Sequence, residues 1–321
     1  MSTVTKAPPA VGQETAVAER PKPRRRPIRP ARLLLHTFLW IVALGWLAPV
    51  LLAVYASLRP YQETAQYGYF SLPKRLSFEY YATAWNESGM LKYFINSMII
   101  AVPGVLLTLL LASFVAFTIA RLRIPGRTLL LVMFTAGNLL PQQIILTPLY
   151  VMFNKVPLPC GVFTVGGTEH CLWSDSGKIY DSYLAVILVH IGFQVGFCVF
   201  VLSNYMRTLP HEITEAAIVD GAGPLRQYWQ VTLPLCRPAL AALATLEFTW
   251  MYNDFLWALV LISTGDKLPI TSALNNLRGQ FFTDYNLLAA GSVLVALPTV
   301  FIFLLLQRHF IAGLTLGANK G

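Results

Sequence analysis

Apolar runs of about 20 residues recur along the chain, and they constrain its fold more than any other feature. A helix of about 20 apolar residues crosses the roughly 30 Å hydrocarbon core of a bilayer. Only 12% of the residues are charged, about half the fraction of a soluble domain, which argues against a water-soluble fold. The predicted fold class is an all-α polytopic membrane protein. Its six predicted transmembrane helices are residues 33–58, 93–120, 128–153, 183–206, 238–263 and 287–306.

Lys and Arg are unevenly distributed between the loops that separate these helices. Cytoplasmic loops of membrane proteins carry the excess of basic residues. Placing both termini in the cytoplasm puts 16 of the 24 Lys and Arg residues inside and leaves 8 outside. We therefore predict that both termini are cytoplasmic and that the net charge of +9 reflects membrane topology. Because the surplus gathers in one tail, no nucleic-acid partner is predicted.

The first 32 residues differ in composition from the remainder of the chain. They are rich in Pro, Ala and Arg and lack a periodic apolar face, which predicts a disordered, basic cytoplasmic tail. The predicted organisation is this tail (1–32), a six-helix transmembrane domain (33–306) with a patterned cytoplasmic loop (207–237), and a C-terminal cytoplasmic tail (307–321).

Two of the four cysteines lie in one predicted outer loop. Cys160 and Cys171 would face an oxidising space there, which favours a disulfide, although two free thiols remain the alternative. Cys198 lies within a predicted helix and Cys236 lies beside one, where cysteine usually behaves as a small apolar residue.

The loop between the fourth and fifth helices carries the most informative pattern. Residues 211–234 read HEITEAAIVDGAGPLRQYWQVTLP. Acidic residues among apolar ones predict a short amphipathic helix, which Gly221 and Gly223 can end and which Pro224 prevents from continuing. The acidic positions are Glu212, Glu215 and Asp220.

Small residues in this helix would let another protein approach closely. Ala216, Ala217 and Gly221 permit close approach of a partner backbone, and the charges of Glu215 and Asp220 suit a basic cleft. A helix lying on the membrane surface is the alternative, but an anionic inner leaflet disfavours an acidic helix.

The spacing within residues 211–234 resembles the coupling loop of binding-protein-dependent ABC importers. The order is Glu-Ala-Ala, three residues, Gly, nine residues, an aliphatic residue, one residue and Leu-Pro. The matching residues are Glu215, Ala216, Ala217, Gly221, Val231, Leu233 and Pro234. We call residues 211–234 the coupling segment. Residues 94–99, 120–127 and 307–321 are similar to the corresponding parts of maltose-type carbohydrate importers.

The resemblance implies a set of partners and a location. In that family the short cytoplasmic helix docks in a cleft of an ATP-hydrolysing subunit and transmits its closure to the membrane helices. The implied partners are a second permease subunit, two ATPase subunits, an extracytoplasmic solute-binding protein, the lipid bilayer and a sugar as cargo. The implied location is the cell membrane of a prokaryote. The outer loop 160–178 is longer than is usual in the family, which puts contacts with the binding protein in doubt.

The chain lacks the sequence motif of an ATPase. A phosphate-binding loop needs Gly-Lys followed by Ser or Thr, whereas Gly177-Lys178 precedes Ile179. ATP and Mg²⁺ are therefore assigned to the partner subunits, and no catalytic residue or bound cofactor is predicted for this chain. No His-Glu-x-x-His or Cys-x-x-Cys pattern occurs, so no metal site is predicted.

The fifth predicted helix carries a polar and aromatic stripe. Seven residues return a helix almost to the same side, which aligns Glu247 with Asp254 and Trp250 with Trp257. Charges inside a membrane normally face the protein interior, and carboxylates with indole rings suit a sugar. These residues and Asn253, next to Asp254, are predicted to line the substrate path. The alternative is ordinary packing at a helix interface.

Amides near Pro141 are further candidates for the path. Asn138 and Gln142 flank this proline in the third predicted helix, and polar groups beside a broken helical turn often line a cavity. Hydrogen bonding between helices is the alternative.

Three other functions remain open at this point. The cargo could be another solute such as a glycerol-phosphate. Glu247 and Asp254 could form the ion site of a secondary transporter, but the coupling segment would then have no purpose. The same carboxylates could serve an integral-membrane enzyme, although no nucleophile accompanies them.

Overall fold

The computed structural model is nearly all helical and describes residues 30–87, 89–122, 124–138, 140–158, 162–165, 168–171, 176–278 and 283–315. The helices, in chain order, are α1 (Pro30–Ser57), α2 (Tyr61–Tyr67), α3 (Glu79–Glu87), α4 (Met90–Arg121), α5 (Arg127–Gly137), α6 (Gln142–Lys155), α7 (Tyr183–Thr208), α8 (His211–Val219), α9 (Pro224–Arg226), the π-helix η1 (Gln227–Thr232), α10 (Leu233–Leu235), α11 (Arg237–Tyr252), α12 (Leu256–Leu261), the 3-10 helix η2 (Gly265–Lys267), α13 (Ile270–Ala273), the 3-10 helix η3 (Leu274–Leu277) and α14 (Tyr285–Thr315). One antiparallel hairpin, β1 (Val162–Val165) and β2 (Thr168–Cys171), interrupts the helical pattern within the predicted outer loop.

The chain divides into two units, Met1–Pro49 and Val50–Gly321. The described part of the first unit belongs to α1, which starts with Pro30 in its first turn, where a missing backbone N–H costs nothing. Residues 1–29, most of the predicted disordered tail, lie outside the described residues. The predicted C-terminal tail is outside them from residue 316 onward, and α14 includes its first part.

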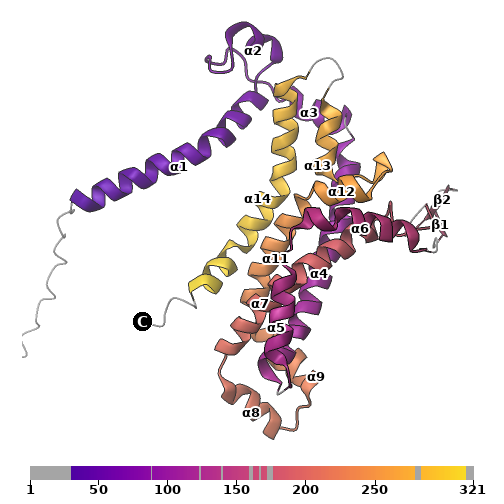
Figure 1. Ribbon diagram of the computed structural model, residues 1–321. Helices are drawn as coiled ribbons and strands as arrows, with labels where there is room; N and C mark the ends of the chain where they lie inside the picture. Colours follow the sequence, from indigo (N-terminus) through magenta and orange to yellow (C-terminus); the bar gives the residue numbers. More distant parts are fainter. Residues whose placement is uncertain are drawn as a thin grey trace, which may run out of the picture. The chain divides into compact units, whose positions relative to one another are not determined.

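A bundle of α4, α7, α11 and α14 forms the centre of the second unit (Figure 1). α4 packs along α7, and α11 packs against both α4 and α14. Small residues of α4 allow these close approaches: Ala101, Ala112 and Ala116 are buried, and a Cβ added at Gly104 would lie 2.7 Å from the sulfur of Met251. Such small residues are typical of helix contacts within membranes, where backbones must pack closely.

Four of the six predicted transmembrane segments correspond to single long apolar helices, namely α1, α4, α7 and the residues Tyr285–Gln307 of α14. Two bent pairs of helices are also apolar enough, so the described chain has between four and six candidate membrane-spanning segments. The prediction of a helical membrane protein with several membrane-spanning segments is therefore confirmed, whereas the predicted number of six such segments remains a prediction.

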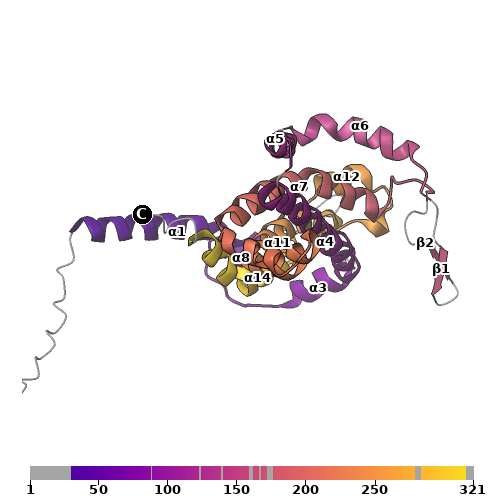
Figure 2. The same cartoon turned by 90° about the horizontal axis from the view of Figure 1, so that it is seen from below.

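The third predicted segment is not one straight helix. α5 and α6 meet at about 90°, and Figure 2 views α5 along its axis while α6 runs across the picture. Pro141 stands at the start of α6 and provides the physical reason, because proline lacks an N–H and disfavours the helical conformation of the residue before it.

The fifth predicted segment is also wrong as a single helix. α11 ends at Tyr252 and α12 starts at Leu256, so Asn253 and Asp254 lie in a helix break. The Asp254 carboxylate accepts a hydrogen bond from Ala258 N at 3.3 Å. This bond satisfies a backbone N–H in the first turn of α12, as a capping side chain does, and so supports a new helix start rather than continuation of the old one.

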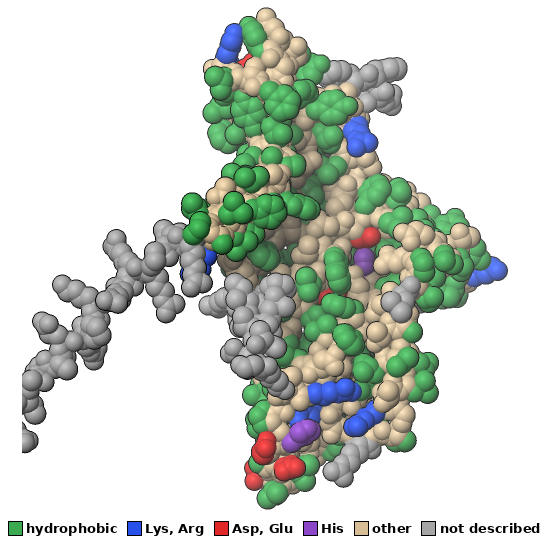
Figure 3. All heavy atoms as spheres, turned by 60° about the vertical axis from the view of Figure 1, so that its left-hand side comes forward, with side chains coloured by type: hydrophobic (Ala, Val, Ile, Leu, Met, Phe, Trp, Pro, Cys, Tyr) green, Lys and Arg blue, Asp and Glu red, His purple; other side chains and the backbone are tan. Residues whose placement is uncertain are grey.

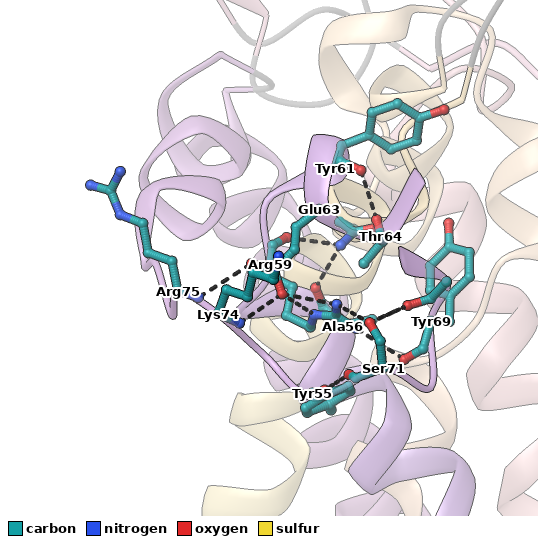
Figure 4. A network of polar contacts seen from close by, with 12 residues as sticks. Tyr55, Ala56, Arg59, Tyr61, Glu63, Thr64, Tyr69, Ser71, Lys74 and Arg75 are labelled. Atoms are coloured by element: carbon teal, nitrogen blue, oxygen red, sulfur yellow. Dashed lines mark hydrogen bonds and ion pairs between the residues drawn. The ribbon is translucent and has the colours of Figure 1, made fainter. Parts of the chain in front are cut away.

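Buried polar contacts around Arg59 connect the end of α1, the loop that follows it and the start of α14 (Figure 4). The guanidinium group of Arg59 pairs with Glu63 at 2.9 Å and donates to Ser71 Oγ at 2.7 Å and Tyr69 O at 3.1 Å. Asn286, at the start of α14, donates to Arg59 O at 2.8 Å. A buried charge is tolerated only with such pairing, so the network fixes the loop 58–75 against α14.

Candidate functional site

α8 provides the short helix predicted within the coupling segment. It ends at Val219, and Gly221 follows with φ of 76°. Gly221 N donates to Ile218 O at 3.0 Å and Ala222 N donates to Ala217 O at 2.9 Å, which together form a Schellman cap. Glycine is needed at this position because its left-handed conformation is costly for other residues.

Most of the predicted coupling residues lie exposed on α8 and the turn after it. These are Glu212, Glu215, Ala216, Asp220 and Gly221. Exposed apolar side chains lie beside them: Ile218 is 58% exposed, Val219 86% and Leu225 70%. A surface of this composition, apolar in part and rimmed by acidic groups, suits a protein partner.

Ala217 differs from the other coupling residues. It is 9% exposed and therefore buried within this chain. Its small side chain serves internal packing, and the expectation that a partner backbone approaches Ala217 directly is not supported by its position. Ala216, one residue earlier, faces solvent.

The second half of the coupling segment is anchored in the bundle by Tyr228. This residue of η1 is buried, its ring stacks on Phe114 of α4 with centroids 4.2 Å apart, and its hydroxyl lies 2.7 Å from Ser113 Oγ. Leu233 and Pro234, the last predicted coupling residues, begin α10 and are half-buried. The pattern Leu-Pro therefore stands where the segment joins the bundle rather than on its free surface.

Arg121 connects three elements at the same end of the molecule. It is the last residue of α4, and its Nη2 donates to Met206 O of α7 at 2.6 Å and to Leu209 O at 3.0 Å. Its Nη1 lies 3.4 Å from Nδ1 of His211, the first residue of α8. The guanidinium group thus binds the carbonyl groups at the carboxyl end of α7, where positive charge is favourable, and fixes the start of α8.

A second candidate site is a cavity of about 430 Å³ at the helix breaks, which we call the central cavity. It is lined by Asn138, Gln142, His190, Phe193, Gln194, Phe197, Trp250, Asp254 and Trp257. Figure 3 shows an acidic and a histidine side chain next to each other in a hollow at mid-height, away from the charged groups at the lower end of the molecule. Five of the seven residues predicted for the substrate path line this cavity.

The two remaining path residues lie elsewhere. Glu247 is fully buried and accepts a hydrogen bond from Cys198 Sγ at 3.1 Å. Asn253 is exposed, and its amide donates to Thr249 O at 2.8 Å. The prediction assumed a continuous helix, but the break after Tyr252 removes Glu247 from the stripe that contains Asp254.

Both sides of the cavity are held in place by side chains from distant parts of the chain. Trp257 Nε1 donates to Gln142 Oε1 at 3.2 Å, which joins α12 to α6. A Cβ added at Gly196 of α7 would lie 2.1 Å from Phe134 O and 2.7 Å from the amide group of Asn138. α5 therefore packs directly on the backbone of α7, and only glycine permits this approach.

One complete wall of the cavity is not among the residues predicted from the sequence. His190, Phe193, Gln194 and Phe197 all come from α7. Their spacing of three, one and three residues places them on one helix face, and this pattern was available as a signal. By sequence alone, however, a histidine and a glutamine among apolar residues look the same as ordinary contacts within a helix bundle.

The predicted disulfide remains a prediction. Cys160 lies outside the described residues, and of Cys171 only the backbone in β2 is described. Cys198 and Cys236 are free and buried.

A comparison with models of known protein families identifies the family of this chain. The family described as "Binding-protein-dependent transport system inner membrane component" matches residues 104–315, about two thirds of the chain. The chain belongs to this family. It is therefore a multi-pass permease subunit of an ABC importer, and the matched residues contain both the coupling segment and the central cavity.

Similar proteins extend over most of the permease. It is 31% identical to the osmoprotective compounds uptake permease protein GgtD of Synechocystis sp. (strain ATCC 27184 / PCC 6803 / Kazusa), over 90% of this chain and 92% of that protein. It is 34% identical to the alpha-glucoside transport system permease protein AglG of Rhizobium meliloti (strain 1021), over 78% of this chain and 62% of that protein. It is 30% identical to the diacetylchitobiose uptake system permease protein NgcG of Streptomyces coelicolor (strain ATCC BAA-471 / A3(2) / M145), over 78% and 77% respectively.

The fold of the permease is found among solved structures. A chain of a bacterial ABC transporter involved in the import of the acidic polysaccharide alginate superposes with a TM-score of 0.72 at 20% identity. The match covers 88% of this permease and 97% of that chain. A structure of the alginate transporter in complex with a pentasaccharide-bound periplasmic protein gives a TM-score of 0.62 at 16% identity.

Proposed function

We propose that this permease moves a sugar or sugar derivative across the cell membrane by alternating access, driven by separate ATPase subunits that dock on α8. The observation that carries the proposal is the arrangement of α8: one of its faces is exposed, its start contacts Arg121 of α4, and the turn after it is held by Gln227, next to the buried Tyr228. A helix that served only as a connector would need none of these features.

Two anchors would carry movement of α8 into the membrane helices. Arg121 joins the start of α8 to α4 and α7. At the other end, Gln227 Nε2 donates to Ala222 O at 2.6 Å, and the adjacent Tyr228 is stacked on α4. Because α4 and α7 are packed along each other, a displacement of α8 would move this pair as a unit. Packed helices of this kind slide or tilt as rigid bodies rather than deform.

The expected assembly follows from the family and from the surface of α8. ATP and Mg²⁺ would be bound by two ATPase subunits, and a second permease would complete the membrane part. A binding protein would deliver the cargo on the side opposite α8. Several similar permeases bear the names of saccharide transport systems, which supports a sugar as cargo.

The cap of α8 offers the test of this proposal. Gly221→Val keeps the surface of α8 but places a β-branched residue at φ of 76°, which costs roughly 1–2 kcal/mol and shifts or frays the helix end. We expect uptake of labelled sugar by membrane vesicles that contain the whole importer to fall about tenfold, since 1.4 kcal/mol corresponds to a factor of ten. The amount of permease in the membrane should not change.

Gly223→Ala is the matched control. Gly223 has φ of −66°, and no atom would lie within 4 Å of an added Cβ, so alanine should be tolerated there. Equal uptake by the Gly221→Val permease and the wild type would contradict a coupling role for α8.

A further inference from the structure

We propose that the central cavity is a binding subsite for an uncharged saccharide unit, and that Asp254 excludes acidic sugars from it. The proposal rests on the function proposed above and adds the class of cargo. It also assigns cargo contact to this subunit itself, through residues of α7 that face residues of the α11–α12 break across the cavity.

The charge of the lining separates neutral from acidic cargo. Asp254 and His190 are the ionisable groups of the lining, and no Lys or Arg is among the described lining residues. A carboxylate or phosphate of a sugar would therefore meet the Asp254 carboxylate with no Lys or Arg to balance it; among the described lining residues His190, whose Nε2 lies 3.7 Å from Asp254 Oδ2, is the one group that can carry positive charge. Two like charges held close together repel each other, and Asp254 therefore discriminates by repulsion.

Polar atoms of the lining are available to hydroxyl groups. His190 Nε2 and Gln194 Oε1 are buried atoms with no hydrogen-bond partner among the described residues. His190 Nε2 lies 3.7 Å from Asp254 Oδ2, which is too long for a hydrogen bond. Buried polar groups are nearly always paired in native proteins, so atoms left unpaired around a cavity are available to the polar groups of a ligand. Sugar hydroxyl groups both donate and accept hydrogen bonds, so they can pair with His190, Gln194 and Asp254.

Aromatic rings supply the apolar surfaces that a sugar ring needs. Trp250 lies against Phe197 with centroids 5.4 Å apart, and Trp257 lies against Phe193 at the same distance. Trp250 is 47% exposed and its indole can therefore be reached, whereas Trp257 is 1% exposed and supports the wall. The volume of about 430 Å³ is within the range of about 300–1,000 Å³ that small-molecule sites occupy.

Equilibrium binding of sugar probes to the intact importer in nanodiscs tests the subsite. The binding protein is left out, so that its own selectivity does not contribute. The probes are maltose, cellobiose and N,N′-diacetylchitobiose as neutral sugars, with digalacturonate and glucose 6-phosphate as acidic ones. We expect at least one neutral probe to bind, and the acidic probes to bind at least tenfold more weakly.

Two substitutions and a control assign the binding to the cavity. Trp250→Ala should weaken binding of the neutral probe at least tenfold, and Asp254→Asn, which is isosteric, should bring the acidic probes to within about threefold of the neutral one. Leu259→Ala, an exposed residue of α12 that does not line the cavity, should leave all probes unchanged. Preference for an acidic probe in the wild type, or neutral binding unaffected by Trp250→Ala, would overturn the inference. So would the absence of binding by every neutral probe.

The coupling function can be judged separately in the same preparation. If the ATPase subunits remain bound to α8 and ATP hydrolysis continues while no neutral probe binds, the subsite is wrong and the proposed function stands. If no ATPase subunit associates with this permease, the proposed function itself is wrong.

Discussion

The coupling segment and the central cavity differ in how far apart in the sequence their parts lie. The coupling segment is built from residues 211–234, and its helix, cap and anchor follow one another along the chain. The cavity joins Asn138 after α5 with residues of α6, α7, α11, the α11–α12 break and α12, between positions 138 and 257. Local chemistry determines the first site, whereas the second depends on where long helices break and which faces then meet.

This difference gives the two sites opposite sensitivities. The coupling segment should be sensitive to changes in its own cap and in its two anchors, Arg121 and Tyr228, and should tolerate substitutions elsewhere in the distant helices. The cavity should respond most to substitutions that alter how α5 and α7 approach each other.

The largest expected effect comes from Gly196→Ala in α7. An added Cβ would meet the backbone oxygen of Phe134 at 2.1 Å, and a backbone atom cannot move aside as a flexible side chain can. Overpacking of this kind costs about 1–3 kcal/mol, and here it would separate α5 from α7 and open the cavity. We expect a lower thermal unfolding temperature of the purified importer and loss of sugar uptake.

Gly192→Ala is the control for that prediction, because it lies one turn earlier on α7 and has no atom within 4 Å of an added Cβ. Equal unfolding temperatures for the two variants would show that α5 does not pack on α7 at Gly196.

Substitution of Arg121 should uncouple ATP hydrolysis from uptake. Arg121→Gln removes charged hydrogen bonds to Met206 O and Leu209 O and the contact with His211. Hydrogen bonds to charged groups contribute about 1.5–3 kcal/mol, so the number of sugars moved per ATP should fall about tenfold. Arg121→Lys keeps the charge but not the planar set of donors, so its number of sugars moved per ATP should lie between those of the wild type and Arg121→Gln. A ratio unchanged in Arg121→Gln would remove Arg121 from the route between α8 and the bundle.

A smaller effect is expected for Tyr228→Phe. The ring and its stacking on Phe114 remain, and only the hydroxyl contact with Ser113 is lost. Ser113 Oγ still donates to Leu110 O at 2.9 Å, so the Ser113 hydroxyl keeps a hydrogen-bond partner. The cost should be about 1 kcal/mol in thermal unfolding, with uptake reduced less than in Arg121→Gln. A loss as large as that of Arg121→Gln would place the hydroxyl group, rather than the ring, at the centre of the anchor.

The helices could be predicted from the sequence more fully than the breaks between them and the residues that line the cavity. The apolar runs at α1, α4, α7 and α14 identified these helices, and the glycine after α8 identified its end. Residues 128–153 were predicted as one segment in spite of Pro141, and the structure bends them there, for which the backbone chemistry of proline gives the reason. The break after Tyr252 has no proline or glycine to announce it, and Asp254, beside the break, accepts a hydrogen bond from Ala258 N in the first turn of α12. Glu247 was therefore predicted to line the path although it does not line the cavity. The α7 wall could not be predicted in the same way, because its polar face lines a cavity only once the α11–α12 break lies across from it.

The smallest expected effect concerns acid conditions at Asp181, just before the start of α7. Asp181 accepts hydrogen bonds from Ser263 N at 2.8 Å and Thr264 N at 2.9 Å, and its carboxylate lies 4.0 Å from Lys267 Nζ. Burial raises the pKa of Asp181, but the hydrogen bonds from Thr264 and Ser263 and the charge of Lys267 outweigh it, and the pKa lies below its usual value. The folded state therefore gains stability from ionised Asp181 above the usual aspartate pKa of about 3.9, and loses this gain as the pH falls through the lowered value.

Hydrogen exchange of the backbone amides of Ser263 and Thr264 measures this link. Their protection should decrease as the pH is lowered toward 3, after correction for the intrinsic pH dependence of exchange, and Asp181→Asn should abolish that decrease. A decrease of the same size in Asp181→Asn would assign it to another group.

Cross-linking from two adjacent alanines of α8 tests the central claim most directly. Ala216 is exposed and Ala217 is 9% exposed, so Ala216→Cys and Ala217→Cys differ chiefly in access to a partner. With a short bifunctional thiol reagent applied to the intact importer, Ala216→Cys should capture an ATP-hydrolysing subunit at a yield that changes when ATP is added, and Ala217→Cys should capture little. Capture of no nucleotide-binding protein from Ala216→Cys, or reaction of that cysteine only with reagents confined to the outer side of the membrane, would contradict the account.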